Sequence, residues 1–394
     1  MQDESLHPSI QEITARMVNA MQSGQYEAAL PLLNTLIARD PNDAQLLFSR
    51  GLAHHQLSRH AEAIRDFDRA EAAGLRDADL YLTRAWSQAY SQNAEAALAD
   101  LQRALDLQPS AIIYKTRAML YERWAQTEQA LADWGAAIAL EPTNGELYLR
   151  RAVARFRHTA APDRAQQALA DADAAIYRGY QRPNAYAFRA ELHAELGDNA
   201  AALRDLDEAI ALDRRFAVAY RQRAQVLLQL GRYDEALNDL NMAIKISPDA
   251  ALYVLRGQAY LARGQGDDAI KARQDFAQVP EHDKWYPDAL LGRGLAYMRL
   301  NRPDRAEQDF YSVLSHPDTI GWEDERKALA WLILALAQQG KWDDARDQIR
   351  MMGEFYREHG LADVAAVAQR EGWNAEQQAL YAQAWRLTLG DTTS

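Results

Sequence analysis

The sequence contains no cysteine among its 394 residues. Disulfides, thiolate metal sites and cysteine nucleophiles are therefore excluded, and packing alone must hold the chain together. Basic residues are in deficit, since 44 Lys and Arg stand against 56 Asp and Glu, for a formal net charge of −12. Nonspecific binding to nucleic acid or to an anionic membrane needs a basic surface, so we expect neither.

Long apolar runs are missing as well. No run reaches the roughly 18 residues that indicate a membrane-spanning helix. The start "MQDESLHPSI" lacks the basic residues and the apolar core of a signal peptide. We expect no membrane insertion and a cytoplasmic protein; a periplasmic or secreted location stays open if Met1 replaces a removed signal peptide. Apolar residues make up 48% of the chain and prolines number only 12, which is the composition of a folded protein.

The chain repeats itself. Stretches such as "RYDEALNDL", "DNAAALRDL" and "RHAEAIRDF" recur with a period of about 34 residues, the signature of a repeat architecture. Aligning these stretches divides the chain into ten units, which begin near Ile10, Ala44, Ala78, Ala111, Gly145, Pro183, Ala217, Ala250, Pro287 and Arg326.

Each unit is predicted to be a hairpin of two helices, because its apolar residues have helical spacing. A glycine in the middle of the unit suits a helix C-terminus, where a left-handed residue is needed, and a proline near the end stops the second helix. These residues are Gly24, Gly197, Gly231, Gly264 and Gly340 in mid-unit, and Pro41, Pro109, Pro142 and Pro248 near the unit end. A hairpin this small cannot cover its own apolar face, so the units must stack into a solenoid.

One unit shows the recurring pattern in full: Tyr220, Ala224, Leu227, Gly231, Tyr233, Ala236, Leu240, Ala243 and Pro248. This pattern resembles the tetratricopeptide repeat, and "YxxRA/G…A…DL/DF…AI" resembles its arginine-containing RG/RA variant. The first unit departs from it in lacking the leading Tyr, the fifth carries extra residues in "RHTAAPDRAQ", and the tail departs after about Gly353. The resemblance implies an all-α, right-handed superhelical solenoid whose concave groove is lined by the first helix of each hairpin, and a protein-binding role.

Three regions are predicted along the chain: a main body of units one to eight (1–277), units nine and ten with longer loops (278–359), and C-terminal capping helices with a tail (360–394). The loops "VPEHDKWYP" (279–287) and "SHPDTIGWEDE" (315–325) are interpreted as spacers or as a contact site on the rim. Asn374 and Gln377 are predicted to cap the last helix. That helix places Leu380, Tyr381, Trp385 and Leu389 on one side, which either caps the stack or pairs with a second copy of the chain.

An arginine recurs as the seventh residue of nine units, on the apolar side of the first helix. In seven units an aspartate stands at position 23, and the two positions are equally far from a turn near position 15, so they can meet. We predict a structural ladder of ion pairs, in which an aspartate could also reach the arginine of the next unit. The predicted pairs are Arg50 with Asp66, Arg84 with Asp100, Arg117 with Asp133, Arg151 with Asp171, Arg189 with Asp205, Arg223 with Asp239, and Arg293 with Asp309.

Motifs for catalysis are missing: there is no HExxH, no GxSxG, no phosphate-binding glycine loop and no dinucleotide fingerprint. His54, His55 and His60 lie close in sequence, but adjacent helix residues point apart and no carboxylate follows at the spacing of metal ligands. We therefore predict no enzyme, no cofactor and no metal site.

Function is instead expected on the surface of the first helices. The tyrosines at position 4 are interpreted as packing, and the resemblance to the tetratricopeptide repeat assigns positions 2, 5, 9, 12 and 13 to the groove stripe. In units two to five this stripe is apolar and aromatic with a basic edge, which is typical of a binding surface. Its residues are Phe48, Leu52, Leu82, Trp86, Tyr90, Ile112, Lys115, Met119, Arg123, Leu149, Val153, Phe156 and Arg157. The alternative is that the superhelix or the terminal segment buries part of it.

The sequence thus favours a non-catalytic scaffold that binds a peptide or helix of a partner protein, as an adaptor or assembly factor. The alternative is a structural homo-oligomer that uses the groove or Trp385 for self-association. A clamp for a peptide carboxylate is not expected, because Lys115 has no asparagine partners at the neighbouring groove positions.

Overall fold

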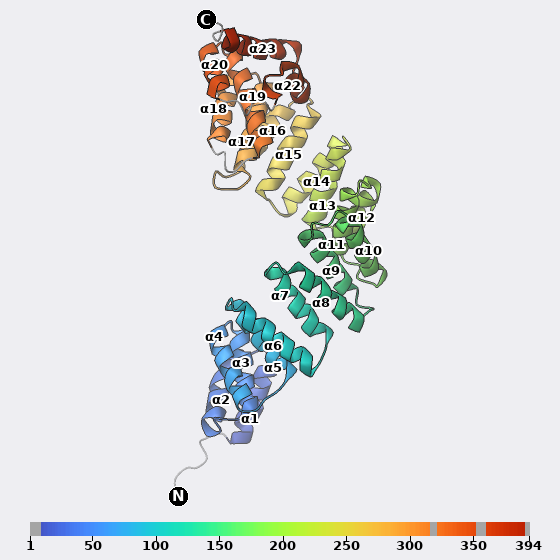
Figure 1. Ribbon diagram of the computed structural model, residues 1–394, viewed down its shortest axis with the longest axis vertical. Coiled ribbons are helices and arrows are strands. Elements are labelled where there is room, and N and C mark those ends of the chain that lie inside the picture. Colours follow the sequence, from blue (N-terminus) through green and yellow to red (C-terminus); the bar gives the residue numbers. More distant parts are fainter. Residues whose placement is uncertain (1–8, 316–320, 352–359, 391–394) are drawn as a thin grey trace. The chain divides into compact units, whose positions relative to one another are not determined.

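The computed structural model describes residues 9–315, 321–351 and 360–390, and within these ranges every regular element is a helix (Figure 1). Internal contacts divide the chain into two compact units, Met1–Leu196 and Gly197–Ser394. In each unit, helices that follow one another in sequence pack as antiparallel hairpins, and each hairpin packs on the next. The predicted all-α solenoid class is confirmed.

The first unit contains the helices α1 (Ile10–Gln22), α2 (Tyr26–Arg39), α3 (Ala44–Gln56), α4 (His60–Ala72), α5 (Ala78–Tyr90), α6 (Ala94–Leu107), α7 (Ala111–Arg123), α8 (Thr127–Leu140), α9 (Gly145–His158), α10 (Arg164–Tyr177) and α11 (Pro183–Glu195). The second unit contains α12 (Asn199–Leu212), α13 (Ala217–Gln229), α14 (Tyr233–Ile246), α15 (Ala250–Arg263), α16 (Asp268–Phe276), α17 (Tyr286–Arg299), α18 (Pro303–Leu314), α19 (Trp322–Gln338), α20 (Trp342–Met351), α22 (Val364–Glu371) and α23 (Ala375–Gly390).

The predicted unit starts agree closely with the helix starts. In eight of the ten units the first helix begins at the predicted residue. The exceptions are α17, which begins at Tyr286, one residue before the predicted Pro287, and α19, which begins at Trp322 instead of Arg326. Proline is tolerated in a first helical turn, and three acidic residues in the first turn of α19 favour an early start through the helix dipole.

The turn inside most hairpins contains a residue with positive φ; the longer turn between α9 and α10 has none. Gly231 adopts it with φ of 69°, as the glycine pattern predicted. Four hairpins place another residue there: Ser58, Gln92, Ala125 and Asn301, with φ between 55° and 60°. A side chain with a Cβ is strained in this region, so these hairpins have less favourable turns than the ones that end in glycine.

Ala125→Gly is therefore expected to raise the free energy of unfolding, by about 1 kcal/mol, because glycine adopts the left-handed conformation of residue 125 without strain. Thermal or urea denaturation measures this effect. The matched control is Ala99→Gly, an exposed position in the middle of α6, where the same change should cost about 1 kcal/mol. A loss of stability in both variants would contradict the turn argument.

A glycine or an alanine stands directly after each of the recurring arginines from Arg50 to Arg293, and the residue that faces this position determines which of the two fits. A Cβ on Gly51 would lie 2.7 Å from the ring of Phe67, and a Cβ on Gly257 would lie 2.7 Å from the ring of Phe276. The same close approach joins Gly294 to a phenylalanine of its own hairpin. Glycine therefore stands where a fully buried phenylalanine fills the space between the two helices.

The C-terminal helices cover the last hairpin. Asn374 and Gln377 form the predicted capping box, with each backbone amide donating to the other side chain at 2.9–3.0 Å. Helix α23 packs on α19 and α20 and buries Tyr381 and Trp385, which are 0% and 4% exposed. The prediction of a capping helix is therefore correct for these two residues. The side chain of Leu389 lies outside the described residues.

The burial of Trp385 corrects the alternative that used it for self-association, because a side chain packed in the core of its own chain offers no surface to a second copy. The loop 279–287 contributes Val279 and Trp285 to the core around α15 and α17, and its interpretation as a spacer or a rim contact site stays a prediction. Residues 316–320 of the second loop lie outside the described residues, and the predicted region boundaries stay predictions.

Candidate functional site

The recurring arginine meets the aspartate of its own hairpin through two parallel hydrogen bonds. In the second hairpin, Nε of Arg50 donates to Oδ2 of Asp66 at 2.7 Å and Nη2 donates to Oδ1 at 2.6 Å. The same two-pronged geometry, at 2.6–2.9 Å, joins five further predicted pairs: Arg84 with Asp100, Arg117 with Asp133, Arg151 with Asp171, Arg223 with Asp239, and Arg293 with Asp309. Arg189 lies in the compact unit Met1–Leu196 and Asp205 in the compact unit Gly197–Ser394, and their pairing stays a prediction.

One pair was missed from the sequence. Arg256 makes the same two bonds to Asp275, at 2.6 and 2.8 Å, although Ala272 occupies position 23 of that unit. The partners are 19 residues apart instead of the usual 16, because the turn of this hairpin is longer. The signal was present in the dipeptide Asp275 and Phe276, which repeats the "DF" that follows position 22 in other units.

The third guanidinium nitrogen reaches back to the preceding hairpin. Nη1 of Arg223 donates to Asp207 at 2.5 Å, and Nη1 of Arg84 donates to Asp68 at 2.8 Å. Corresponding bonds at 2.7–2.9 Å join Arg50 to Asn34, Arg117 to Gln102, Arg189 to Asp173, and Arg256 to Asn241. Apart from Asn34, which stands two positions after Leu32, the link between hairpins thus uses a polar residue two positions after the aspartate, because both oxygens of that aspartate are already occupied by its own arginine.

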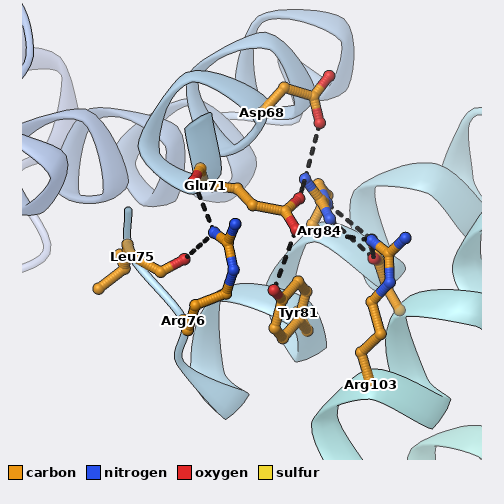
Figure 2. A network of polar contacts seen from close by, with 8 residues as sticks. Asp68, Glu71, Leu75, Arg76, Tyr81, Arg84 and Arg103 are labelled. Atoms are coloured by element: carbon orange, nitrogen blue, oxygen red, sulfur yellow. Dashed lines mark hydrogen bonds and ion pairs between the residues drawn. The ribbon is translucent and has the colours of Figure 1, made fainter. Parts of the chain in front are cut away.

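The network around Arg84 shows the arrangement at its most buried (Figure 2). The Arg84 side chain is 4% exposed and contacts Asp100 at 2.7 Å, Asp68 at 2.8 Å and Glu71 at 2.7 Å, while the Tyr81 hydroxyl donates to Glu71 at 3.0 Å. Burial alone would lower the pKa of Arg84, but its hydrogen bonds to Asp100 and Glu71 outweigh burial and raise it. The guanidinium therefore stays charged inside the stack.

The tyrosines at position 4 lie against these arginines. Each guanidinium carbon is 5.5–5.8 Å from the ring centroid of the tyrosine three residues earlier, within the range of a cation–π contact. The tyrosines are Tyr81, Tyr114, Tyr148, Tyr186, Tyr220 and Tyr253, all buried or half-buried. They pack between helices and also cover the arginine that fixes the hairpin.

Asp239→Ala should destabilise the chain by about 3 kcal/mol, because it leaves Arg223 largely buried without its partner. The double variant Arg223→Leu with Asp239→Leu should recover much of this loss, since apolar residues of similar size remove both charges. Chemical denaturation measures both.

The matched control is Asp207→Ala. This carboxylate also binds Arg223 but is 63% exposed, so its loss should cost about 0–1 kcal/mol. Equal losses for Asp207→Ala and Asp239→Ala would contradict the distinction between an internal pair and an external link.

The predicted groove stripe proves unequal in exposure. Tyr90 and Ile112 are 55% and 54% exposed, and Arg123 and Arg157 are exposed as well. Phe48, Leu52, Leu82, Trp86, Lys115, Met119 and Val153 are half-buried. Leu149 and Phe156 are buried, at 5% and 8% exposed, which corrects their assignment to a contact surface: they lie in a core cluster of α7–α11, with Phe156 packed edge-on against Phe188.

The basic edge of the stripe is largely neutralised within the chain. Lys115 forms an ion pair with Glu146 at 3.3 Å, and Arg157 forms one with Glu191 at 2.7 Å. Each pair joins neighbouring first helices, α7 to α9 and α9 to α11. Glu146 and Glu191, both on first helices, are therefore the partners of the basic edge.

An aromatic and histidine cluster lies at the exposed end of α5. The ring of Tyr90 stacks on His60 with centroids 4.7 Å apart, and Trp86 lies 6.1 Å from Tyr90. Nδ1 of His55 lies 2.8 Å from Oγ of Ser87, and burial lowers the pKa of His55. This cluster, which the sequence analysis did not foresee, holds the Trp86 and Tyr90 rings against α3 and α4.

The described ranges contain no group of three or more His, Asp or Glu side chains placed to hold a metal ion. They also contain no helix that is both long and apolar enough to span a bilayer.

Helical hairpins that stack on one another, most of them held together by an Arg–Asp pair between their two helices, define a helical-repeat protein. Family models described as tetratricopeptide repeat match residues 16–78, 217–249 and 254–318. The chain is a tetratricopeptide repeat protein. Proteins of this family are in general non-catalytic scaffolds for protein–protein interaction.

A segment of the chain is also similar to Bacteriophage adsorption protein A of Escherichia coli (strain K12), with 30% identity over 144 residues. The matched segment spans 36% of this chain but only 14% of that protein.

Among solved structures, a tetratricopeptide repeat protein from Parabacteroides merdae is 18% identical, with a TM-score of 0.48 and coverage of 66% of this chain and 98% of that one. The C-terminal part of a repeat protein from Cytophaga hutchinsonii is 14% identical, with a TM-score of 0.46 and coverage of 71% and 98%. YrrB, described as a repeat protein with an unusual peptide-binding site, is 21% identical, with a TM-score of 0.40 and coverage of 48% and 95%.

Proposed function

We propose that the chain is a non-catalytic scaffold that binds a segment of a partner protein across the first helices α3, α5, α7 and α9. The observation that carries this proposal is the exposure of Tyr90 and Ile112, two large apolar side chains that are each more than half accessible. Tyr90 ends α5 and Ile112 is the second residue of α7, so the two lie toward opposite ends of neighbouring first helices. Exposed apolar residues that continue into a patch of further apolar side chains are typical of a contact surface, whereas single ones are common on any protein.

The half-buried residues between these two anchors support the same surface. Leu82, Trp86 and Met119 pack against the core on one side and leave part of their side chains accessible. Aromatic anchors held in place by their own fold dominate binding energies, because little side-chain entropy is lost when a partner arrives. The stacking of Tyr90 on His60 fixes one such anchor in advance.

The charges on this surface indicate what kind of segment fits. Lys115 and Arg157 already pair with Glu146 and Glu191, so a partner gains little by offering them a carboxylate. Affinity should therefore depend on apolar side chains of the bound segment, as when an amphipathic helix lies on a hydrophobic surface. We accordingly propose an adaptor or assembly role for an apolar segment of another protein.

The experiment that tests this proposal is an affinity capture from the lysate of the source organism with two baits, the unchanged chain and a Tyr90→Ala, Ile112→Ala variant. Both substitutions remove mostly exposed atoms, so thermal stability should change little. A partner retained by the first bait is expected to be reduced at least about tenfold on the second, because two anchors of about 1–2 kcal/mol each are lost.

The control bait is Leu107→Ala, Tyr177→Ala, which removes two exposed apolar side chains from the ends of α6 and α10, both second helices. It should retain the partner. Equal capture by all three baits would overturn the assignment of function to this surface, and recovery of the chain alone would instead support self-association.

A further inference from the structure

The second unit contains a pocket that the proposed function does not use. The first helices of its last three hairpins, α15, α17 and α19, and the turn between α22 and α23 line a partly open pocket of about 460 Å³. Leu261, Leu291, Leu295 and Trp331 supply its apolar lining. This volume lies within the range of about 300–1,000 Å³ that is typical of ligand pockets.

One end of the pocket carries two carboxylates that lack a counter-ion. Asp288 is half-buried near the start of α17, and Asp324 stands at the start of α19. Burial raises the pKa of Asp288, and the charge of Asp324 raises it further, so the two groups repel each other across the pocket. Among the residues that the structure describes, no cationic side chain, Lys327 of the pocket wall included, lies within 4.0 Å of either carboxylate.

The other end carries a cation with a neutral partner. Arg299 stands eleven residues after Asp288 on α17, and its Nη1 donates to the backbone carbonyl of Leu261. A carboxylate would bind the guanidinium more strongly than this neutral carbonyl does. At a rise of 1.5 Å per residue, the Cα atoms of Asp288 and Arg299 are about 16 Å apart along the helix.

The remaining wall is fixed by bonds within the chain. Glu371 accepts one hydrogen bond from Nε1 of Trp331 at 2.9 Å and another from Nε of Arg370 at 2.9 Å. These bonds hold the end of α22 against α19 and use the charge of Glu371. Within the described ranges, the carboxylates of Asp288 and Asp324 at one end and the guanidinium of Arg299 at the other therefore have no partner of opposite charge within ion-pair distance, nor does the ammonium of Lys327 one turn after Asp324, and apolar side chains line the wall between the ends.

We propose that this pocket binds a short extended peptide segment with a basic side chain at the Asp288 end, a carboxylate at the Arg299 end and apolar side chains between. An extended chain rises about 3.3 Å per residue, so residues one and five of a pentapeptide are about 13 Å apart at their Cα atoms, and their long charged side chains can cover the rest of the span of about 16 Å. Charge complementarity at both ends and the apolar lining favour this occupant over a uniformly apolar or a uniformly acidic one. The pocket lies in the second unit, so this site and the stripe around Tyr90 can succeed or fail independently.

The test uses the full chain and pools of fluorescein-labelled pentapeptides with apolar residues at the three central positions. Two pools carry Arg and Glu at the ends, in either order, because the chain direction is not fixed by the charges. Two further pools carry only Arg or only Glu, and one pool carries neither. Fluorescence anisotropy should show that one mixed-charge pool binds at least about tenfold more tightly than the uncharged pool, since each charged bond contributes measurably.

Variants then assign the ends. Asp288→Asn should weaken binding of the mixed-charge pool several-fold but leave binding of the Glu-only pool unchanged. Arg299→Gln should also weaken binding of the mixed-charge pool several-fold but leave binding of the Arg-only pool unchanged. Asp344→Asn is the matched control, because this carboxylate is exposed on α20 and does not line the pocket. Equal binding of charged and uncharged pools, or equal effects of Asp288→Asn and Asp344→Asn, would overturn the proposal.

Discussion

The guanidinium group at the seventh position fixes the register of three helices at once in five hairpins, those of Arg50, Arg84, Arg117, Arg223 and Arg256. Two of its nitrogens hold the aspartate on the second helix of its own hairpin, and the third holds a polar residue of the hairpin before it. Because the arginine donors have fixed directions, the bonds specify height and rotation as well as contact. Net stability from such largely buried pairs is small, so the arrangement is better understood as a constraint on how hairpins stack than as a source of folding energy.

This constraint leaves the opposite side of the first helices free to vary. The arginine, its tyrosine and the facing phenylalanine or smaller residue occupy the inner side of most hairpins, and the groove stripe stays at least partly accessible except at Leu149 and Phe156. In the compact unit Met1–Leu196 that stripe carries aromatic and aliphatic residues, and the basic residues at its edge mostly form ion pairs with glutamates of the same unit. In the second unit the C-terminal helices fold over the same stripe and convert it into a pocket with charges of opposite sign at its ends. One repeat thus supports two chemically different surfaces.

The parts of the structure that could be predicted from the sequence depend on spacing within one unit. The hairpins, the capping box at Asn374 and most Arg–Asp pairs follow from positions relative to a turn. Arg256 and Asp275 were missed because a longer turn shifts the spacing. The burial of Leu149 and Phe156 could not be predicted, because it depends on how closely neighbouring first helices approach. The pocket could not be predicted either, since residues from 258 to 377 meet there only after the tail has folded back.

Hydrogen exchange of the Arg223→Leu variant, followed by mass spectrometry, tests the account of the arginine most directly. If the guanidinium joins its hairpin to the preceding one, amides of α12, α13 and α14 should exchange much faster, while α1–α10 keep their protection, because each repeat depends mainly on its neighbours. Unchanged exchange in these three helices, or an equal increase along the entire chain, would contradict the claim that this one side chain fixes the register of the stack.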